Sequence, residues 1–140
     1  LTHTHSGLRW IIICLLFIAI INAARNKNTY LKKDKIINLL AMISLHIQLL
    51  VGLMLYFSSA KVSFSTDWIK NELLRFYGLE HFVGMIFAII LVTIGYSKSK
   101  KLSVPHKKNR TIFVYYFLGF LLLLLFIPWP FRSTLGGAWF

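Results

Sequence analysis

The chain has 140 residues, of which 57% are hydrophobic and 16% aromatic, and it carries 16 basic but only four acidic residues. A mean hydropathy of +0.68 indicates a membrane protein and excludes an ordinary soluble domain. The formal net charge of +12 would suggest a nucleic-acid partner in a soluble protein. In an apolar chain, the location of the basic residues decides what the charge means.

Four apolar runs are long enough, or nearly long enough, to cross a bilayer as helices of about 20 residues. They lie at about 6–24, 36–57, 78–96 and 111–131. We therefore expect an all-α fold, a polytopic membrane four-helix bundle in which residues 1–140 form a single transmembrane domain. The runs leave no stretch for a separate soluble domain.

Most of the basic residues lie in two short loops, between the first two runs and between the last two. These residues are Arg25, Lys27, Lys32, Lys33, Lys35, Lys98, Lys100, Lys101, Lys107, Lys108 and Arg110. The positive-inside rule makes both loops cytoplasmic, with both termini and the middle loop outside. We expect a multi-pass protein of a bacterial inner membrane. Membrane lipid is an expected partner, since such loops also attract anionic headgroups, and nucleic acid is not.

The middle loop contains the pattern of a short helix. The residues at 65–67, Ser-Thr-Asp, suit an N-cap, and apolar side chains then recur at helical spacing at Trp68, Ile69, Leu73 and Phe76. We therefore expect a short amphipathic helix on the outer surface. Arg75 and Glu80 lie close enough in sequence to pair.

The third run carries a histidine at the head of a stripe of small side chains. At 100° per residue, one helix face holds His81, Gly84, Met85, Ala88, Val92 and Gly95. Ionisable groups at such a depth are costly and usually functional. The stripe accepts either another helix, through Gly84 and Ala88, or a flat ligand.

The second run carries a polar seam and a histidine that lies away from it. Ser44, Gln48 and Gly52 follow at four-residue steps, so we expect the seam to contact a neighbouring helix. His46 is turned about 200° from Gln48 and points towards a different partner. A neutral histidine bonded to a backbone carbonyl or to water is the alternative explanation for His46.

A haem b held between helices needs two imidazoles at nearly equal depth. Counted from the inner helix ends, His46 lies at roughly 15 Å, His81 at roughly 22 Å and His5 at roughly 28 Å. His46 with His81 and His5 with His81 are both feasible pairs, and His81 belongs to each. Arg75 or Arg9, on the outer side, suits the haem propionates.

Several short segments resemble one family. They are His5-Ser-Gly-Leu-Arg-Trp10, Leu45-His-Ile-Gln-Leu-Leu-Val-Gly52, Glu80-His81, Ile94-Gly-Tyr-Ser-Lys-Ser-Lys100 and Ile127-Pro-Trp-Pro-Phe-Arg132. Together they resemble small four-helix membrane proteins of Bacteroidota that are commonly labelled cytochrome b-like. More loosely, the histidine-bearing helices are similar to those of haem A synthase and other b-type bundles. The resemblance implies His46 and His81 as metal-binding haem ligands, with His5 in reserve, and one haem, because the fourth run has no histidine.

Two functions follow as hypotheses. The first is a b-type cytochrome-like subunit that holds one haem b for electron transfer, within a larger membrane complex. The second is a haem-free accessory subunit of a respiratory or envelope complex, bound to other membrane subunits. A transporter and a copper-handling protein remain further alternatives. We do not expect an enzyme, because the sequence has no nucleophile beside a base, no paired carboxylates at membrane depth and no phosphate-binding loop.

Overall fold

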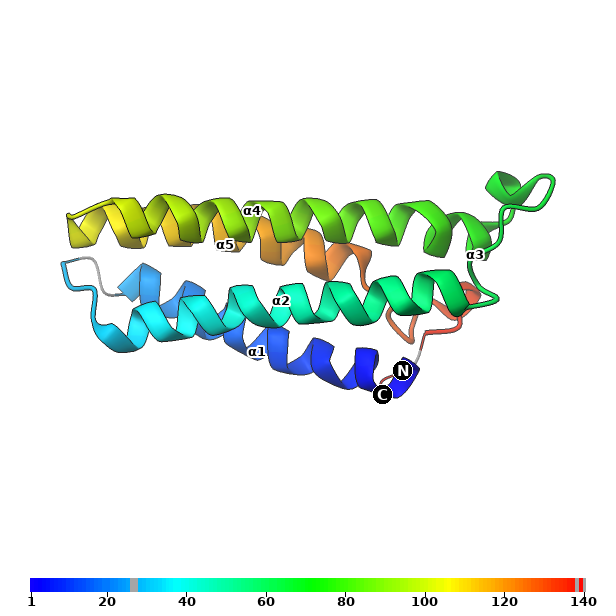
Figure 1. Ribbon diagram of the computed structural model, residues 1–140, viewed down its shortest axis with the longest axis horizontal. Coiled ribbons are helices and arrows are strands. Elements are labelled where there is room, and N and C mark those ends of the chain that lie inside the picture. Colours follow the sequence, from blue (N-terminus) through cyan, green and yellow to red (C-terminus); the bar gives the residue numbers. More distant parts are fainter. Residues whose placement is uncertain (26–27, 138, 140) are drawn as a thin grey trace.

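The structure is a computed structural model that describes residues 1–25, 28–137 and 139. Four long helices run up and down beside one another (Figure 1): α1 (Thr2–Arg25), α2 (Lys32–Ser58), α4 (His81–Lys101) and α5 (Pro105–Phe126). All four are long and apolar enough to cross a membrane, the third span running over Glu72–Lys101. The predicted all-α four-helix bundle is confirmed.

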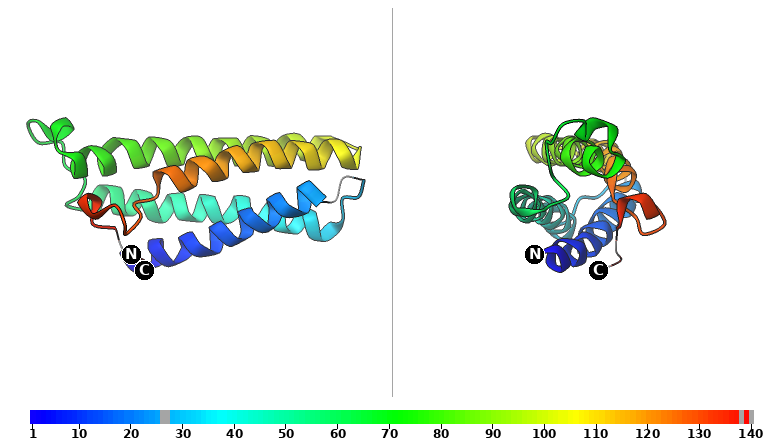
Figure 2. Two further views of the ribbon diagram at one scale, coloured as in Figure 1. Left: turned by 180° about the vertical axis from the view of Figure 1, so that it is seen from behind. Right: turned by 90° about the vertical axis from the view of Figure 1, so that its right-hand side faces the viewer.

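The helices form a ring in which each packs against two others. The neighbours are α1 and α2, α2 and α4, α4 and α5, and α5 and α1, and the contact between α4 and α5 is the most extensive. The start of α1 and the segment after α5 lie at one end together with the loop between α2 and α4 (Figure 2). We call this the terminal end, and the opposite end, with residues 28–31 and 102–104, the basic end.

Several helix boundaries differ from the predicted ones, among them the starts of α2 and α5, where polar residues extend the helix, and the end of α5, where prolines follow. Helix α2 begins at Lys32 rather than near 36, and the carboxylate of Asp34 accepts a hydrogen bond from the Leu31 N–H at 2.8 Å. Helix α5 begins at Pro105 rather than 111, since proline suits a first helical position that needs no N–H donor. Helix α5 ends at Phe126 rather than 131, just before Pro128 and Pro130.

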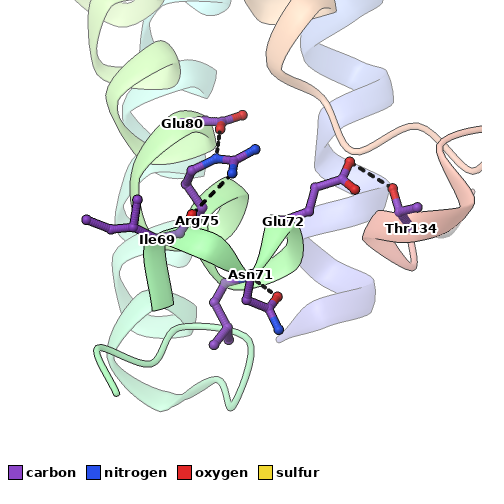
Figure 3. Close-up of polar contacts among 7 residues, drawn as sticks. Ile69, Asn71, Glu72, Arg75, Glu80 and Thr134 are labelled. Atoms are coloured by element: carbon purple, nitrogen blue, oxygen red, sulfur yellow. Dashed lines mark hydrogen bonds and ion pairs between the residues drawn. The ribbon is translucent and has the colours of Figure 1, made fainter. Parts of the chain in front are cut away.

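The predicted amphipathic helix of the middle loop is not a separate helix. Asp67 adopts a left-handed conformation (φ 66°), and only a 3₁₀ turn, η1 (Trp68–Lys70), follows it. Asn71 is the actual N-cap, accepting from the Leu74 N–H at 3.1 Å, and α3 (Glu72–Arg75) begins there (Figure 3). A π-helical turn, η2 (Phe76–Glu80), joins α3 to α4, so this half of the predicted helix belongs to the third membrane span.

The stripe of small residues on α4 packs against α5. Gly84, Ala88, Val92 and Gly95 are all buried there. A Cβ atom at Gly84 would overlap the ring of Phe126, which lies at the end of α5. Of the two alternatives predicted for the stripe, the structure shows the contact with another helix, because α5 occupies the space that a flat ligand would need.

Polar contacts close the bundle at the basic end. The Tyr116 hydroxyl, fully buried on α5, donates to the Asn38 carbonyl of α2 at 2.7 Å. Asn109 Nδ2 donates to the carbonyl of Thr29 at 2.7 Å. These bonds tie α5 to α2 and to the preceding loop, so the basic end is closed by polar contacts between the helices.

Candidate functional site

Two histidines meet inside the terminal end of the bundle. The ring centroids of His5 on α1 and His81 at the start of α4 lie 6.3 Å apart, with an angle of 73° between the ring planes. Helices α1 and α4 lie diagonally across the ring of helices rather than as neighbours. The pair therefore spans the interior of the bundle, and it is one of the two pairs considered feasible from the sequence.

The position of His81 is fixed by the way α5 ends. A helical carbonyl normally accepts from the N–H four residues later, which for Leu124 and Phe126 falls at Pro128 and Pro130, where no N–H exists. Side chains supply the missing donors. The Trp129 indole donates to Leu124 O at 2.8 Å, and His81 Nδ1 donates to Phe126 O at 2.7 Å. Because Nδ1 carries the proton, Nε2 of neutral His81 has a free lone pair.

The position of His5 is fixed by the polar seam of α2. Gln48 Nε2 donates to the carbonyl of His5 at 2.8 Å, so the seam contacts a neighbouring helix as predicted. A Cβ atom at Gly52 would lie 3.2 Å from Cε1 of His5, so glycine provides the room for the imidazole. Nδ1 of His5 is buried and has no hydrogen-bond partner among the described residues.

His46 lies on the outer surface of α2, away from the other two histidines. Its side chain is exposed, and its Nδ1 donates to the carbonyl of Met42, one turn earlier on the same helix, at 2.8 Å. The structure therefore corrects the pairing of His46 with His81. The cause is the rotation of about 200° that separates His46 from Gln48, which contacts α1.

A partly open cavity of about 230 Å³ lies beside the histidine pair. Its polar lining consists mainly of His5, Arg9, Gln48, Lys61, Tyr77 and His81, and its apolar lining of Leu45, Leu49, Leu53, Met85, Ile89 and Leu123. Typical small-molecule pockets are apolar with a few convergent polar groups and have volumes of about 300–1,000 Å³. The cavity likewise combines an apolar lining with a few polar groups, but its volume is smaller.

Of the two arginines predicted at the site, only Arg9 lines the cavity. Its side chain is only 8% exposed, Nη2 donates to the Trp139 carbonyl at 2.9 Å, and the guanidinium lies 5.4 Å from the ring centre of Trp10. Arg75 instead pairs with Glu80, Nε to Oε1 at 2.7 Å, and donates to the Ile69 carbonyl (Figure 3). The predicted ion pair of Arg75 and Glu80 is confirmed, and it keeps Arg75 outside the cavity lining.

Tyr77 and Lys61 are among the polar residues of the cavity that the sequence did not single out. The Tyr77 hydroxyl donates to Leu135 O at 3.0 Å, and Lys61 Nζ donates to Gly136 O at 3.2 Å. Tyr77 precedes His81 by four residues, so helical spacing could have revealed that it shares the face of His81. Lys61 lies in an irregular loop and gave no such signal.

The segment after α5 folds back over the cavity. Arg9, Lys61 and Tyr77 donate to its backbone carbonyls at Trp139, Gly136 and Leu135, respectively. Gly136 and Gly137 belong to the cavity lining. We call residues 128–137 the tail strap. Its carbonyls at Gly136 and Leu135 accept hydrogen bonds from Lys61 and Tyr77.

The donor set for a metal ion is limited to two imidazoles. Within residues 1–25, 28–137 and 139, no three His, Cys, Asp or Glu side chains are grouped to hold a metal ion. Two imidazoles suit a metal that brings its remaining ligands with it, as the iron of a porphyrin does.

Comparison of the chain with models of protein families, with curated proteins and with solved structures finds no match. The resemblance to cytochrome b-like proteins therefore stays a prediction.

Proposed function

We propose that the chain is a b-type cytochrome-like membrane subunit that holds one haem b between α1 and α4, where His5 and His81 would bind its iron. The observation that carries the proposal is the convergence of the two imidazoles, 6.3 Å apart, in a cavity between the helices. Haem iron would supply one-electron chemistry at this position, so the function is electron transfer.

The separation of the two rings suits one metal ion bound between them. A bond from a first-row metal ion to an imidazole nitrogen is about 2.0–2.1 Å long, as in zinc sites. Ring centres on opposite sides of one ion are therefore roughly 6 Å apart, since each centre lies roughly 1 Å behind its nitrogen. Rotation about the metal–nitrogen bonds leaves the angle between the rings free, so 73° is compatible with shared ligation.

The hydrogen bond of His81 also supports a role as ligand. Metal-binding histidines almost always donate the other ring N–H to a carbonyl or carboxylate, which fixes the ring and the tautomer. His81 does so to Phe126 O, and Nε2 is left for the metal. His5 has an imidazole with a buried, unpartnered Nδ1 beside Gly52.

The cations of the cavity suit the carboxylates of haem. Arg9 and Lys61 both line it, and each already binds an oxygen atom of the tail strap or of Trp139. Propionate oxygens can replace these carbonyls as charge-assisted acceptors. The cavity volume requires lining side chains to move, and Met85, with its flexible thioether chain, is the most adaptable of them.

The charge pattern supports an orientation in which the basic end is cytoplasmic and the histidine pair lies near the outer surface of a bacterial inner membrane. Electron donors and acceptors would then be other membrane subunits or outer-side carriers. The many exposed apolar side chains on all four long helices suit contact with lipid and with such subunits.

The second candidate function is a haem-free subunit of a larger complex. The small cavity volume favours it, as does the tail strap, whose carbonyls already accept hydrogen bonds from Lys61 and Tyr77. In this function the bond from His81 to Phe126 serves only to hold α4 against α5.

An optical spectrum distinguishes the two functions. The proposal predicts a b-type α band in the reduced-minus-oxidised spectrum of protein extracted gently from its membrane, at about one haem per chain. Protein that is helical by circular dichroism and shows no band, even after incubation with haem, would contradict the cytochrome and leave the haem-free subunit.

A further inference from the structure

A second cavity lies at the basic end, far from the histidine pair. It has a volume of about 310 Å³ and lies between the end of α1 and the beginning of α5. Its lining consists of Ala23, Ala24, His106, Asn109, Arg110 and Phe113. The two alanines supply a smooth apolar wall, and the α5 residues supply a cation, a titratable imidazole and an aromatic ring.

Two side chains of α5 give this cavity its cationic side. In the part of the chain that the structure describes, the side chains of Arg110 and His106 are exposed and make no hydrogen bond or ion pair. Two other cations of the basic end have partners, since Lys98 donates to the Tyr115 hydroxyl at 2.8 Å and Lys108 lies over the ring of Tyr30, whereas Arg110 lines the cavity. Arg110 is therefore available to a ligand.

The surroundings leave the positive charge uncompensated. Of the four acidic residues in the sequence, only Asp34 lies at the basic end, and its carboxylate is buried, where it accepts from the Leu31 N–H. The other acids, Asp67, Glu72 and Glu80, belong to the terminal end. The beginning of α5 has no side-chain cap at Val104, so its helix dipole adds to the positive potential.

An apolar track leads from the cavity along the outer face of α5. Phe113 and Phe117 stack with their ring centres 5.7 Å apart and nearly parallel, at an angle of 4°. Both side chains are exposed, and both lie on the face of α5 that begins at Arg110. A cation, an apolar wall and an aromatic track thus follow one another in the direction of the bilayer centre.

We propose that this cavity binds an anionic phospholipid, with the headgroup phosphate on the guanidinium of Arg110 and an acyl chain along Phe113 and Phe117. A guanidinium binds phosphate through two parallel hydrogen bonds, which a point charge cannot do. Ala23 and Ala24 leave the space that the glycerol region of the lipid occupies. This proposal does not depend on haem binding.

Native mass spectrometry of the full chain tests the proposal. Protein in detergent is titrated with phosphatidylglycerol and, separately, with phosphatidylcholine, and the fraction of lipid-bound protein is measured. We expect phosphatidylglycerol to bind preferentially and Arg110→Gln to weaken this binding roughly tenfold, as a lost charge-assisted hydrogen bond implies. Lys100→Gln, which removes the same charge from the basic end outside the cavity, should change it less than twofold.

A second variant tests the cavity rather than the charge. Ala24→Leu keeps every cation but fills the space beside the apolar wall. It should therefore weaken phosphatidylglycerol binding. Equal effects of Arg110→Gln and Lys100→Gln, or no effect of Ala24→Leu, would overturn the site in favour of diffuse surface charge. Inorganic phosphate is added as a competitor. If millimolar phosphate displaces phosphatidylglycerol as strongly as added lipid does, the cavity is a site for free phosphate instead.

Discussion

The carbonyl oxygen of Phe126 lies 2.7 Å from Nδ1 of His81, and this bond joins the end of α5 to the start of α4. Residue 130, which would donate to that carbonyl in a continuing helix, is proline. Pro130 therefore leaves the Phe126 carbonyl free to orient the side chain of His81, which lies 45 residues earlier in the chain than Phe126. The relationship can be tested without any cofactor.

Replacing His81 by phenylalanine should destabilise the protein even when no haem is bound. His81→Phe keeps a ring of similar shape but leaves the Phe126 carbonyl without its donor, at a cost of about 1–3 kcal/mol. The measurement is the free energy of unfolding in mixed micelles. His46→Phe is the control, because His46 is exposed and bonds only within its own helix, and its effect should stay within about 0.5 kcal/mol. Equal losses in the two variants would contradict the structural role of His81.

A methyl group on the small stripe of α4 should disturb the contact with α5. Gly84→Ala places a Cβ atom against the Phe126 ring, and overpacking of this kind costs about 1–3 kcal/mol. Gly7→Ala on α1 is the matched control, since nothing lies within 4 Å of a Cβ atom at Gly7. Removal of a helical glycine there should stabilise the protein by up to about 1 kcal/mol. Thermal midpoints in detergent measure both effects. An unchanged midpoint for Gly84→Ala would mean that the stripe does not pack against α5.

A methyl group at Gly52 should affect cofactor binding more than folding. The new Cβ atom would lie 3.2 Å from Cε1 of His5, which can shift by a few tenths of an ångström, so we expect a change in unfolding free energy below about 1 kcal/mol. The displaced imidazole should nevertheless lower the haem content of Gly52→Ala protein relative to Gly7→Ala protein. Unchanged haem content would mean that His5 is not a ligand or that haem binding tolerates a small shift of its imidazole.

The two predicted arginines should behave differently in the haem-bound protein. Arg9→Gln removes a cation from the cavity lining and should lower the midpoint potential, by roughly 60 mV for each 1.4 kcal/mol of lost electrostatic stabilisation of the reduced state. Arg75→Gln removes contacts with Glu80 and Ile69 that lie outside the cavity lining and should leave the potential unchanged. Redox titration followed at the α band gives both values, and a larger shift for Arg75→Gln would contradict the assignment.

Removal of the Tyr77 hydroxyl should loosen the tail strap. In Tyr77→Phe the Leu135 carbonyl loses a bond of about 1 kcal/mol, so amide exchange in the strap should become roughly fivefold faster. Tyr115→Phe removes a hydroxyl that bonds to Lys98 and serves as the control. Hydrogen exchange of the peptide that contains residues 133–137 is the readout, and equal rates in the two variants would show that Tyr77 does not hold the strap.

The sequence predicted the fold because the apolar runs, the basic loops and the polar seam are local patterns. Gln48 was expected to contact another helix, and it does so through the His5 carbonyl. The helix ends were less predictable, since basic residues such as Lys32 continue the apolar helices instead of ending them.

The site was only partly predictable. A depth count along straight helices carries an error of about 7 Å, which is as large as the depth difference between the two histidines of either feasible pair. The exposed position of His46 depends on which face of α2 packs inward. The tail strap contributes backbone carbonyls, such as that of Gly136. Every residue has a carbonyl, so the sequence does not indicate which of them line a site.

If His5 and His81 bind one haem between them, the reduced-minus-oxidised spectra of three alanine variants will show it. We predict that the b-type α band of the unaltered protein is lost in His5→Ala and in His81→Ala and retained in His46→Ala, whose side chain is exposed on α2. Loss of the band in His46→Ala with retention in His5→Ala would contradict the pairing.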